Sequence, residues 1–285
     1  MNAPSRPPIC RGDTVLLADV GNTRIKLAVV EEHGDDAGGR RLPRIGRRQD
    51  LLSRDFRPTN LETWLAGVAP GPAVLLVASV HEAAAVRLEA AVAEVSATRH
   101  RAVRQRRIGH ADLPLAVLVD EPHRVGIDRV AAAAAAAVVK DPTRPAIVVD
   151  CGTATTVNLV SAAGEFLGGA ILPGPALMAR GLAEGTSRLP EVAALDHAPP
   201  PPLPGRSTQA AIAAGIGWGI RGAVERLVAE AQRPFAGAAQ VILTGGSAGI
   251  VRDCLPGAVE LPDLVLAGIA LAAARACAPR KTNAV

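Results

Sequence analysis

Two Asp-x-Gly segments stand out, because each follows a short apolar run that is typical of a buried strand. The first begins at Asp19 in DVGNTRIKLAVV, and the second begins at Asp150 in DCGTATTVNLV. Glycine lets the backbone approach a ligand closely, successive N–H groups in a turn attract anions, and carboxylates are ligands for Mg²⁺. One such segment alone is more simply a hairpin turn. The presence of two, each after a strand, favours a site for nucleotide phosphates.

A third candidate is Gly126-Ile127-Asp128-Arg129, which opens a segment rich in alanine. Asp128 could accept a proton from a substrate hydroxyl while Arg129 pairs with an anionic group, since the guanidinium fork suits a carboxylate. Asp128 could instead cap the helix that follows. The spacing alone does not decide between these two interpretations.

A glycine pair, Gly245-Gly246, follows Thr244 at the end of an apolar run. It could let a purine or ribose lie against the backbone, or it could simply connect a strand to a helix. The same stretch has the G-x-S-x-G pattern of a hydrolase nucleophile through Ser247, but that order of residues requires a histidine downstream. All six histidines lie upstream, which excludes the hydrolase, and the chain has no G-x-x-x-x-G-K-[ST] phosphate loop.

The hydrophobic pattern predicts the elements that must position these residues. We expect an exposed loop at 34–48 and a rigid proline-rich linker at 199–204, which could also dock to a polyproline-binding domain. Predicted strands cover 14–18, 25–30, 73–79, 146–149, 156–160 and 240–243, and predicted helices cover 60–68, 83–95, 128–140, 208–231 and 264–276. The strand–turn–strand unit thus occurs twice, which suggests an internal repeat and two similar halves that face each other across a cleft.

The composition of the 285 residues disfavours several classes of protein. Hydrophobic residues make up 49% and aromatic residues only 2%, which disfavours a protein that stacks nucleic-acid bases. The four cysteines form no C-x-x-C pair, so neither a zinc knuckle nor a disulfide framework is indicated. We expect a cytoplasmic protein with neither a signal peptide nor a membrane span. The basic run Arg99–Arg107 more simply forms a solvated edge than a nucleic-acid contact.

Taken in order, these motifs resemble those of the type III pantothenate kinases and the related Bvg accessory factors. This family belongs to the superfamily of acetate and sugar kinases, heat-shock chaperones and actin. The matching segments are Asp19–Lys26, Gly126–Arg129, Asp150–Thr156, Gly168–Gly174, Thr208 and Thr244–Gly246. The resemblance implies an α/β fold of two duplicated ribonuclease H-like halves with mixed sheets and a cleft between them, the actin-like ATPase fold. The halves would be 13–122 and 123–285.

The resemblance also implies an activity, the ATP-dependent phosphorylation of pantothenate to 4'-phosphopantothenate, and residues for it. Asp128 would be the catalytic base, Asp19 would hold Mg²⁺ through the phosphates, and Asp150 would bind a monovalent cation, K⁺ or ammonium. ATP would be bound by Asp19, Val20, Gly21, Asn22, Thr23, Arg24, Ile25, Lys26 and Thr153. Pantothenate would be bound by Gly126, Ile127, Asp128, Arg129, Thr208 and Val119. Relatives are homodimers with the substrate site near the dimer interface.

Two positions depart from the pattern of the family. Val119 stands where relatives commonly carry a tyrosine near pantothenate, and Asn158 stands where they often carry an aspartate. Two other functions are alternatives to the pantothenate kinase. The chain could be a related small-molecule kinase, or a nucleotide-binding regulatory factor that uses the Arg99–Arg107 run on nucleic acid.

Overall fold

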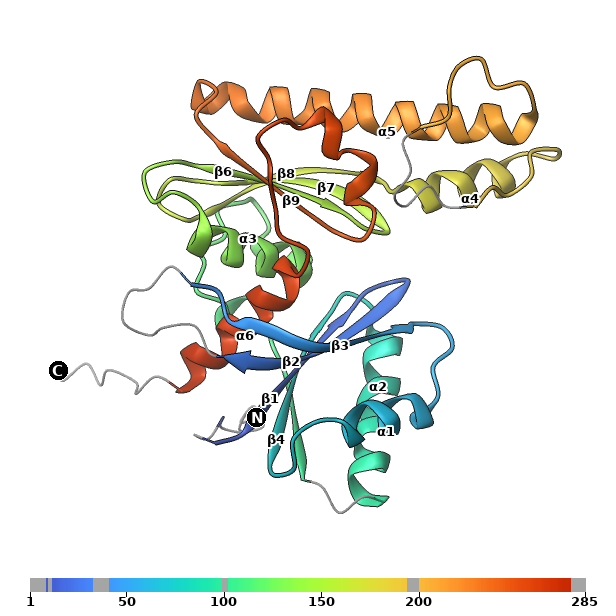
Figure 1. The fold of residues 1–285 in the computed structure, drawn as a ribbon. Helices are drawn as coiled ribbons and strands as arrows, with labels where there is room; N and C mark the ends of the chain where they lie inside the picture. The colour runs from blue at the N-terminus through green and yellow to red at the C-terminus, as the bar shows by residue number, and fades with distance from the viewer. Residues whose placement is uncertain (1–8, 10–11, 33–40, 99–101, 194–199, 278–285) are drawn as a thin grey trace. The chain divides into compact units, whose positions relative to one another are not determined.

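A computed structural model describes residue 9 and residues 12–32, 41–98, 102–193 and 200–277 (Figure 1). The chain divides into two compact units. The first unit contains residues 1–115, 121–139 and 265–285, and the second contains residues 116–120 and 140–264. Each unit is built on one five-stranded sheet.

The sheet of the first unit has the order β3-β2-β1-β4-β5. Its strands are β1 (Thr14–Val20), β2 (Arg24–Glu32), β3 (Arg44–Leu52), β4 (Ala73–Ser79) and β5 (Val103–Arg107). Strands β1, β2 and β3 pair antiparallel, whereas β4 and β5 run parallel to β1. Parallel strands need crossover connections. These are supplied by α1 (Pro58–Ala66) between β3 and β4, and by α2 (Glu82–Thr98) between β4 and β5.

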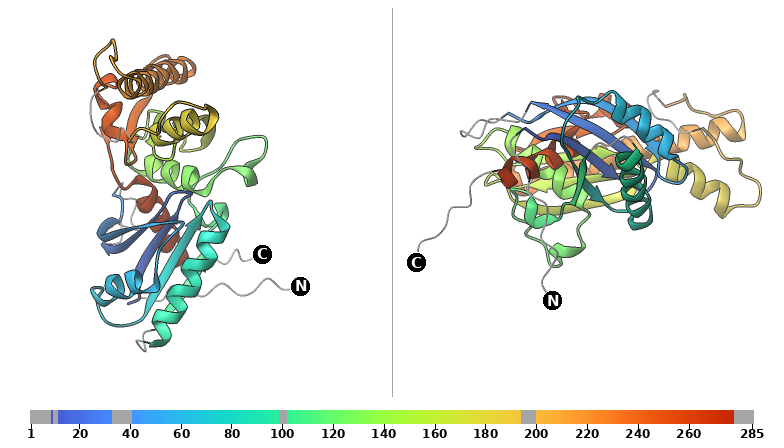
Figure 2. Two further views of the ribbon diagram at one scale, coloured as in Figure 1. Left: turned by 90° about the vertical axis from the view of Figure 1, so that its right-hand side faces the viewer. Right: turned by 90° about the horizontal axis from the view of Figure 1, so that it is seen from below.

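Helices α1 and α2 pack together on one face of this sheet (Figure 2). Their buried side chains, among them Trp64 and Leu88, join Leu16, Leu27 and Leu75 of the strands in one apolar core. Strands β1 and β4 are apolar on both faces, which is typical of parallel strands covered on both sides.

Two further helices belong to the first unit, α3 (Ile127–Val139) and most of α6 (Leu264–Cys277). Helix α3 packs against β4. It is also very close to α6, since a Cβ at Gly268 would overlap the backbone of Ala131. Small residues on both helices permit this distance, which explains the run of alanines in α3.

The sheet of the second unit has the order β10-β9-β6-β7-β8. Its strands are β6 (Ala146–Cys151), β7 (Ala154–Val160), β8 (Phe166–Pro173), β9 (Gln240–Thr244) and β10 (Val259–Glu260). Helix α5 (Thr208–Gln232) packs on the apolar core of this sheet, and α4 (Pro175–Gly185) packs on α5 (Figure 1). Short 3₁₀ turns occur at His110–Asp112, Pro122–Arg124, Arg233–Phe235, Ala248–Ile250 and Arg252–Cys254.

The two sheets share one topology. In each unit the first strand pairs antiparallel with the second, the second pairs antiparallel with the third, and the fourth and fifth continue parallel to the first. This confirms the predicted repeat and the α/β class with two duplicated mixed sheets.

Three features differ from the sequence prediction. The exposed loop predicted at 34–48 is wrong at its end, because Arg44–Arg48 belong to β3; residues 34–40 lie outside the described part of the chain. Strand β3 is the edge of the sheet, where charged residues are common, so its composition concealed it. Strand β8 and helix α4 were not predicted. The units also divide the chain differently from the halves 13–122 and 123–285, because α3 and α6 group with the first unit.

Residues Val103–Arg107 of the basic run form the edge strand β5, whereas residues 99–101 lie outside the described part of the chain. Arg104 pairs with Asp13, and Arg106 Nη2 lies 2.7 Å from Asp112 Oδ1. Arg107 bonds both Glu89 and Glu82, and these hydrogen bonds raise its pKa above the ordinary value. These three arginines are therefore held by carboxylates of the same unit. Among the described residues, no helix is long and apolar enough to cross a membrane.

The Arg106–Asp112 pair is largely buried, so it can be used to test whether the basic run has a structural role. Asp112→Ala should lower the free energy of unfolding by about 3 kcal/mol, because it leaves a buried guanidinium without its carboxylate. Denaturant titration measures the change. Glu121→Ala is the matched control, since its pair with Arg124 is exposed and should change stability by less than about 1 kcal/mol. Equal losses in the two variants would contradict the structural role of the basic run.

Candidate active site

The first Asp-x-Gly segment forms the tight turn between β1 and β2. Asp19 pairs with Lys26 across the hairpin, and Lys26 Nζ lies 4.0 Å from Asp19 Oδ2. Gly21 N donates to Arg24 O at 3.0 Å, which closes the turn. Val20 and Ile25 are fully buried on either side of it. The apolar neighbours thus fix the ends of the turn, and its polar residues lie at the end of the sheet.

The tip of this turn is exposed at Asn22, Thr23 and Arg24. The tip is held by a residue that the sequence analysis missed. Ser53, just after β3, donates its hydroxyl to Gly21 O at 2.8 Å and its N–H to Thr23 O at 3.0 Å. Nothing in the sequence indicates this contact, because Ser53 lies 30 residues from the turn and in no motif.

Asp128 lies in the first turn of α3. The helix begins at Ile127, so Asp128 is inside the helix and does not occupy the cap position that the alternative interpretation gave it. Its Oδ1 accepts a hydrogen bond from Arg129 N at 2.8 Å. Both side chains are half-buried. Burial lowers the pKa of Arg129 below its ordinary value, and the negative charge of Asp128 opposes that shift.

The first turn and the start of α3 lie at the same end of the first sheet. Val80 follows β4, and its N–H donates to Val20 O at 3.1 Å. A Cβ at Gly126 would lie 3.5 Å from Val80 Cγ1, so the residue before α3 packs directly on this connection. Ligands of α/β sheets commonly bind outside the carboxyl ends of parallel strands. The structure thus brings Asp19 and Asp128 to one sheet end, within one unit.

Two other predicted motifs pack against the second Asp-x-Gly segment. Gly245 has φ +97°, and a Cβ there would lie 2.5 Å from Asp150 Oδ1. Ser247 N donates to Cys151 O at 2.9 Å, and Gly174 N donates to Thr153 O at 3.0 Å. The T-G-G segment and the end of the G-G-A-I-L-P-G segment therefore both pack on this turn. Ser247 is buried as part of this packing, which agrees with the exclusion of a hydrolase.

The remaining predicted substrate residues belong to the second unit. A Cβ at Gly168 of β8 would lie 3.5 Å from Val119 Cγ1, so Val119 packs beside β8. Thr208 is the first residue of α5 and is exposed, and the helix is capped by Ser207, whose hydroxyl accepts from Ala210 N at 3.1 Å. Asn158 is fully buried and donates to Thr156 Oγ1 at 2.9 Å.

The available side chains limit how a metal or a nucleophile could take part. Among the described residues, no three His, Cys, Asp or Glu side chains are grouped so as to hold a metal ion. Single carboxylates such as Asp19 still suit Mg²⁺, which usually keeps several waters and binds through one or two carboxylates together with substrate phosphates.

Burial, and secondarily the charge of Asp150, raises the pKa of Cys151 to about 12. Cys151 is therefore a neutral thiol and not a nucleophile.

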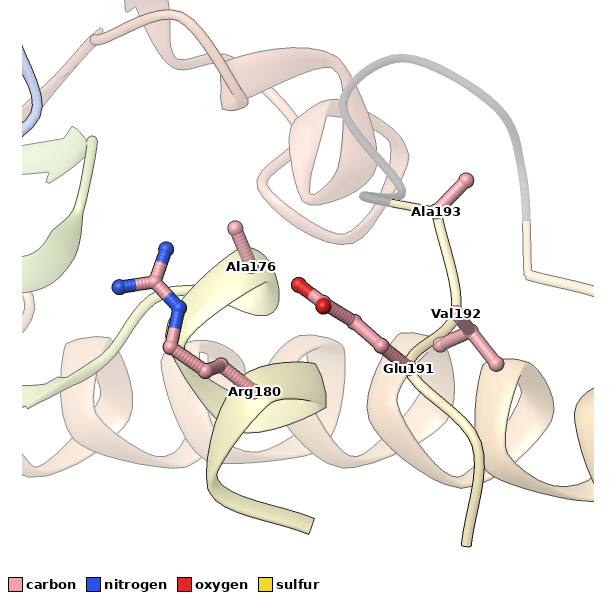
Figure 3. A pocket seen from close by; sticks show the side chains of 5 residues that line it. All are labelled: Ala176, Arg180, Glu191, Val192 and Ala193. Atoms are coloured by element: carbon pink, nitrogen blue, oxygen red, sulfur yellow. The ribbon is translucent and has the colours of Figure 1, made fainter. Parts of the chain in front are cut away.

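A small cavity lies beside α4 in the second unit (Figure 3). Its volume is about 350 Å³, and it is lined by Ala176, Arg180, Glu191, Val192 and Ala193. None of the predicted site residues lines it, so the cavity gives no support to their assignment.

Comparisons with known proteins place the chain among relatives of one kind. A family model for type III pantothenate kinase matches residues 15–230. A type III pantothenate kinase of Rhodopirellula baltica is 43% identical over 194 residues, which cover 66% of this chain and 68% of that protein. The enzyme of the same name from Alkalilimnicola ehrlichii is 36% identical over 268 residues, covering 90% of this chain and 96% of the relative.

Among solved structures, the chain is similar to a putative Baf family transcriptional activator from Campylobacter jejuni. The TM-score is 0.51 at 20% identity, and the match covers 89% of this chain and 94% of that one. At this identity the likeness bears on the fold alone.

The packing of Gly245 against the second turn gives a further test. Gly245→Ala should lower the free energy of unfolding by about 2 kcal/mol or more, because the new methyl group would meet Asp150 and Cys151 at a positive φ. Gly246→Ala is the neighbouring control, since a Cβ there has nothing within 4 Å. Thermal or denaturant unfolding compares the two variants. A larger loss in Gly246→Ala would contradict the described geometry.

Proposed function

Because the chain belongs to the type III pantothenate kinase family, we propose that it transfers the γ-phosphate of ATP to pantothenate. The product is 4'-phosphopantothenate, and the reaction begins the synthesis of coenzyme A. The observation that carries the proposal is the position of Asp128, a carboxylate at the same sheet end as the first phosphate turn. A kinase needs these two features together, a phosphate cradle and a base for the attacking hydroxyl.

In the first unit, residues Asp19–Lys26 bind the ATP phosphates. Backbone N–H groups of the exposed tip and the ammonium of Lys26 supply positive charge, and Asp19 is the residue that would hold Mg²⁺ together with the phosphates. When bound, Mg²⁺ would neutralise part of the negative charge of the phosphates. Asp128 accepts the proton of the primary hydroxyl of pantothenate as that oxygen attacks the γ-phosphorus. Arg129 pairs with the carboxylate of pantothenate, for which a partly buried guanidinium is suited.

In the second unit, we assign Thr153 to ATP, and Thr208 and Val119 to pantothenate. The T-G-G segment at Thr244 is assigned to the adenosine moiety. We assign Asp150 to a monovalent cation, K⁺ or ammonium. The family resemblance supports these roles, together with the convergence of Gly245, Gly174 and Asp150 on one turn. We further propose that the protein is a cytoplasmic homodimer.

The regulatory alternative has less support than the kinase. It would use the basic run on nucleic acid, yet Arg104, Arg106 and Arg107 are bound to carboxylates of their own unit. A related kinase with another substrate has no observation in its favour, although Val119 leaves the contacts to pantothenate open.

The function is tested directly with purified protein, ATP, Mg²⁺ and pantothenate. We expect ATP consumption that requires pantothenate and increases with K⁺, and a phosphorylated product detected by mass spectrometry. Light scattering on the same sample gives the oligomeric state. ATP consumption with another hydroxyl compound, and none with pantothenate, would instead identify the related kinase. Salt-sensitive DNA binding without any kinase activity would identify the regulator.

Asp128→Asn tests the assigned base. The variant should bind ATP with wild-type affinity, because Asp128 is not part of the phosphate turn, and kcat should fall by about 10²-fold or more because the hydroxyl loses its proton acceptor. Asp55→Asn removes an exposed carboxylate of the same unit and should leave kcat unchanged. Wild-type turnover in Asp128→Asn would rule out the role of Asp128.

A further inference from the structure

The inner side of the first phosphate turn is held by a residue outside every motif. Ser53 is fully buried, and it makes two hydrogen bonds to the turn. Its hydroxyl donates to Gly21 O at 2.8 Å, and its backbone N–H donates to Thr23 O at 3.0 Å. Two carbonyl groups of the turn are therefore satisfied from the side of β3.

These bonds fix the direction in which the turn presents its N–H groups. In a trans peptide the C=O and the following N–H point in opposite directions. Among the described residues, the single cis bond is Leu203–Pro204, so the peptides of the turn are trans. With Gly21 O directed toward Ser53, the N–H of Asn22 points away from Ser53.

Ser53 is itself held from a second element. Arg87 of α2 donates from Nη2 to Ser53 O, and its guanidinium lies 5.9 Å from the ring centroid of Phe56. A series of contacts thus runs from α2 through Arg87 and Ser53 to the turn. All of these residues belong to the first unit.

A simpler explanation is that Ser53 only extends the pairing of β2 with β3. That explanation covers the bond from Ser53 N to Thr23 O, since Arg24 and Leu52 are neighbours in the same pairing. It does not cover the hydroxyl, which reaches the residue that follows β1. An alanine would keep the pairing and lose the hydroxyl bond, so the two explanations can be separated.

We propose that Ser53 is a positioning residue for ATP, which orients the N–H groups of the turn toward the phosphates and is supported by Arg87. The proposal rests on the proposed function in one respect, the assignment of Asp19–Lys26 to the ATP phosphates. Ser53 does not touch the reacting atoms, so its effect should appear in nucleotide binding and not in the chemical step.

Ser53→Ala should raise the KM and the Kd for ATP by about five- to tenfold, the effect expected from one lost hydrogen bond. The KM for pantothenate and kcat should stay within about twofold. Ser96→Ala is a matched control, because Ser96 also donates its hydroxyl to a backbone carbonyl, Val92 O at 2.7 Å, but within α2. Equal effects of the two variants on ATP binding, or no effect of either, would overturn the proposal.

Arg87→Met acts on the same contacts without altering the turn or Ser53, so it keeps the test valid if Ser53→Ala folds poorly. It should weaken ATP binding in the same direction. In both variants without nucleotide, the amide of Gly21, which bonds Arg24 O, should exchange hydrogen faster than in wild type or Ser96→Ala. Unchanged exchange at Gly21 in both variants would overturn the proposal independently of any activity.

The outcomes distinguish this proposal from the proposed function. A wild-type protein that binds ATP without phosphorylating pantothenate would refute the function, while the affinities of the variants would still decide the role of Ser53. An active wild-type enzyme with a Ser53→Ala variant that behaves like Ser96→Ala would refute the positioning role alone. A wild-type protein that binds no ATP would refute both.

Discussion

Burial of the central strands determines where this protein can carry polar chemistry. Strands β1 and β6 are apolar along nearly their whole length, because both faces of each are covered. Carboxylates can then reach a ligand only where these strands end, and that is where Asp19 and Asp150 lie. Asp128 lies near the same end of the first sheet as Asp19, since the residue before α3 packs on the connection that follows β4. The distance in sequence between one motif and the next therefore depends on the lengths of the elements that cover the two sheets.

The sequence predicted the structure correctly where the burial of a central strand leaves a recognisable apolar run. An apolar run followed by Asp-x-Gly predicted β1, β2, β6 and β7 and both turns. The repeat of that pattern predicted the duplication of the sheet. The alanine run predicted α3, although its reason became clear only from the close approach of Gly268 to Ala131.

The prediction failed where the relevant contact is remote in sequence or where an element lies at an edge. Strand β3 is rich in charge because it is the edge of its sheet, and strand β8 contains two glycines with positive φ, so neither has the usual strand pattern. The convergence of Gly245 and Gly174 on the second turn depends on strand order, which single motifs do not contain. Ser53 could not be predicted at all, because a lone serine after a charged strand has no recognisable signal.

The shared topology also shows how two similar turns come to differ. Asp19 of the first sheet and Asp150 of the second occupy the same position, near the end of the first strand. The residue paired with Asp19 on the second strand is Lys26, whereas the residue paired with Asp150 is Thr156. A lysine beside the first carboxylate adds positive charge, which favours phosphates. The residue in that place beside the second carboxylate is a threonine, which has a neutral hydroxyl. The two roles that we propose, phosphates at the first turn and a monovalent cation at the second, thus agree with this one difference across a duplicated hairpin.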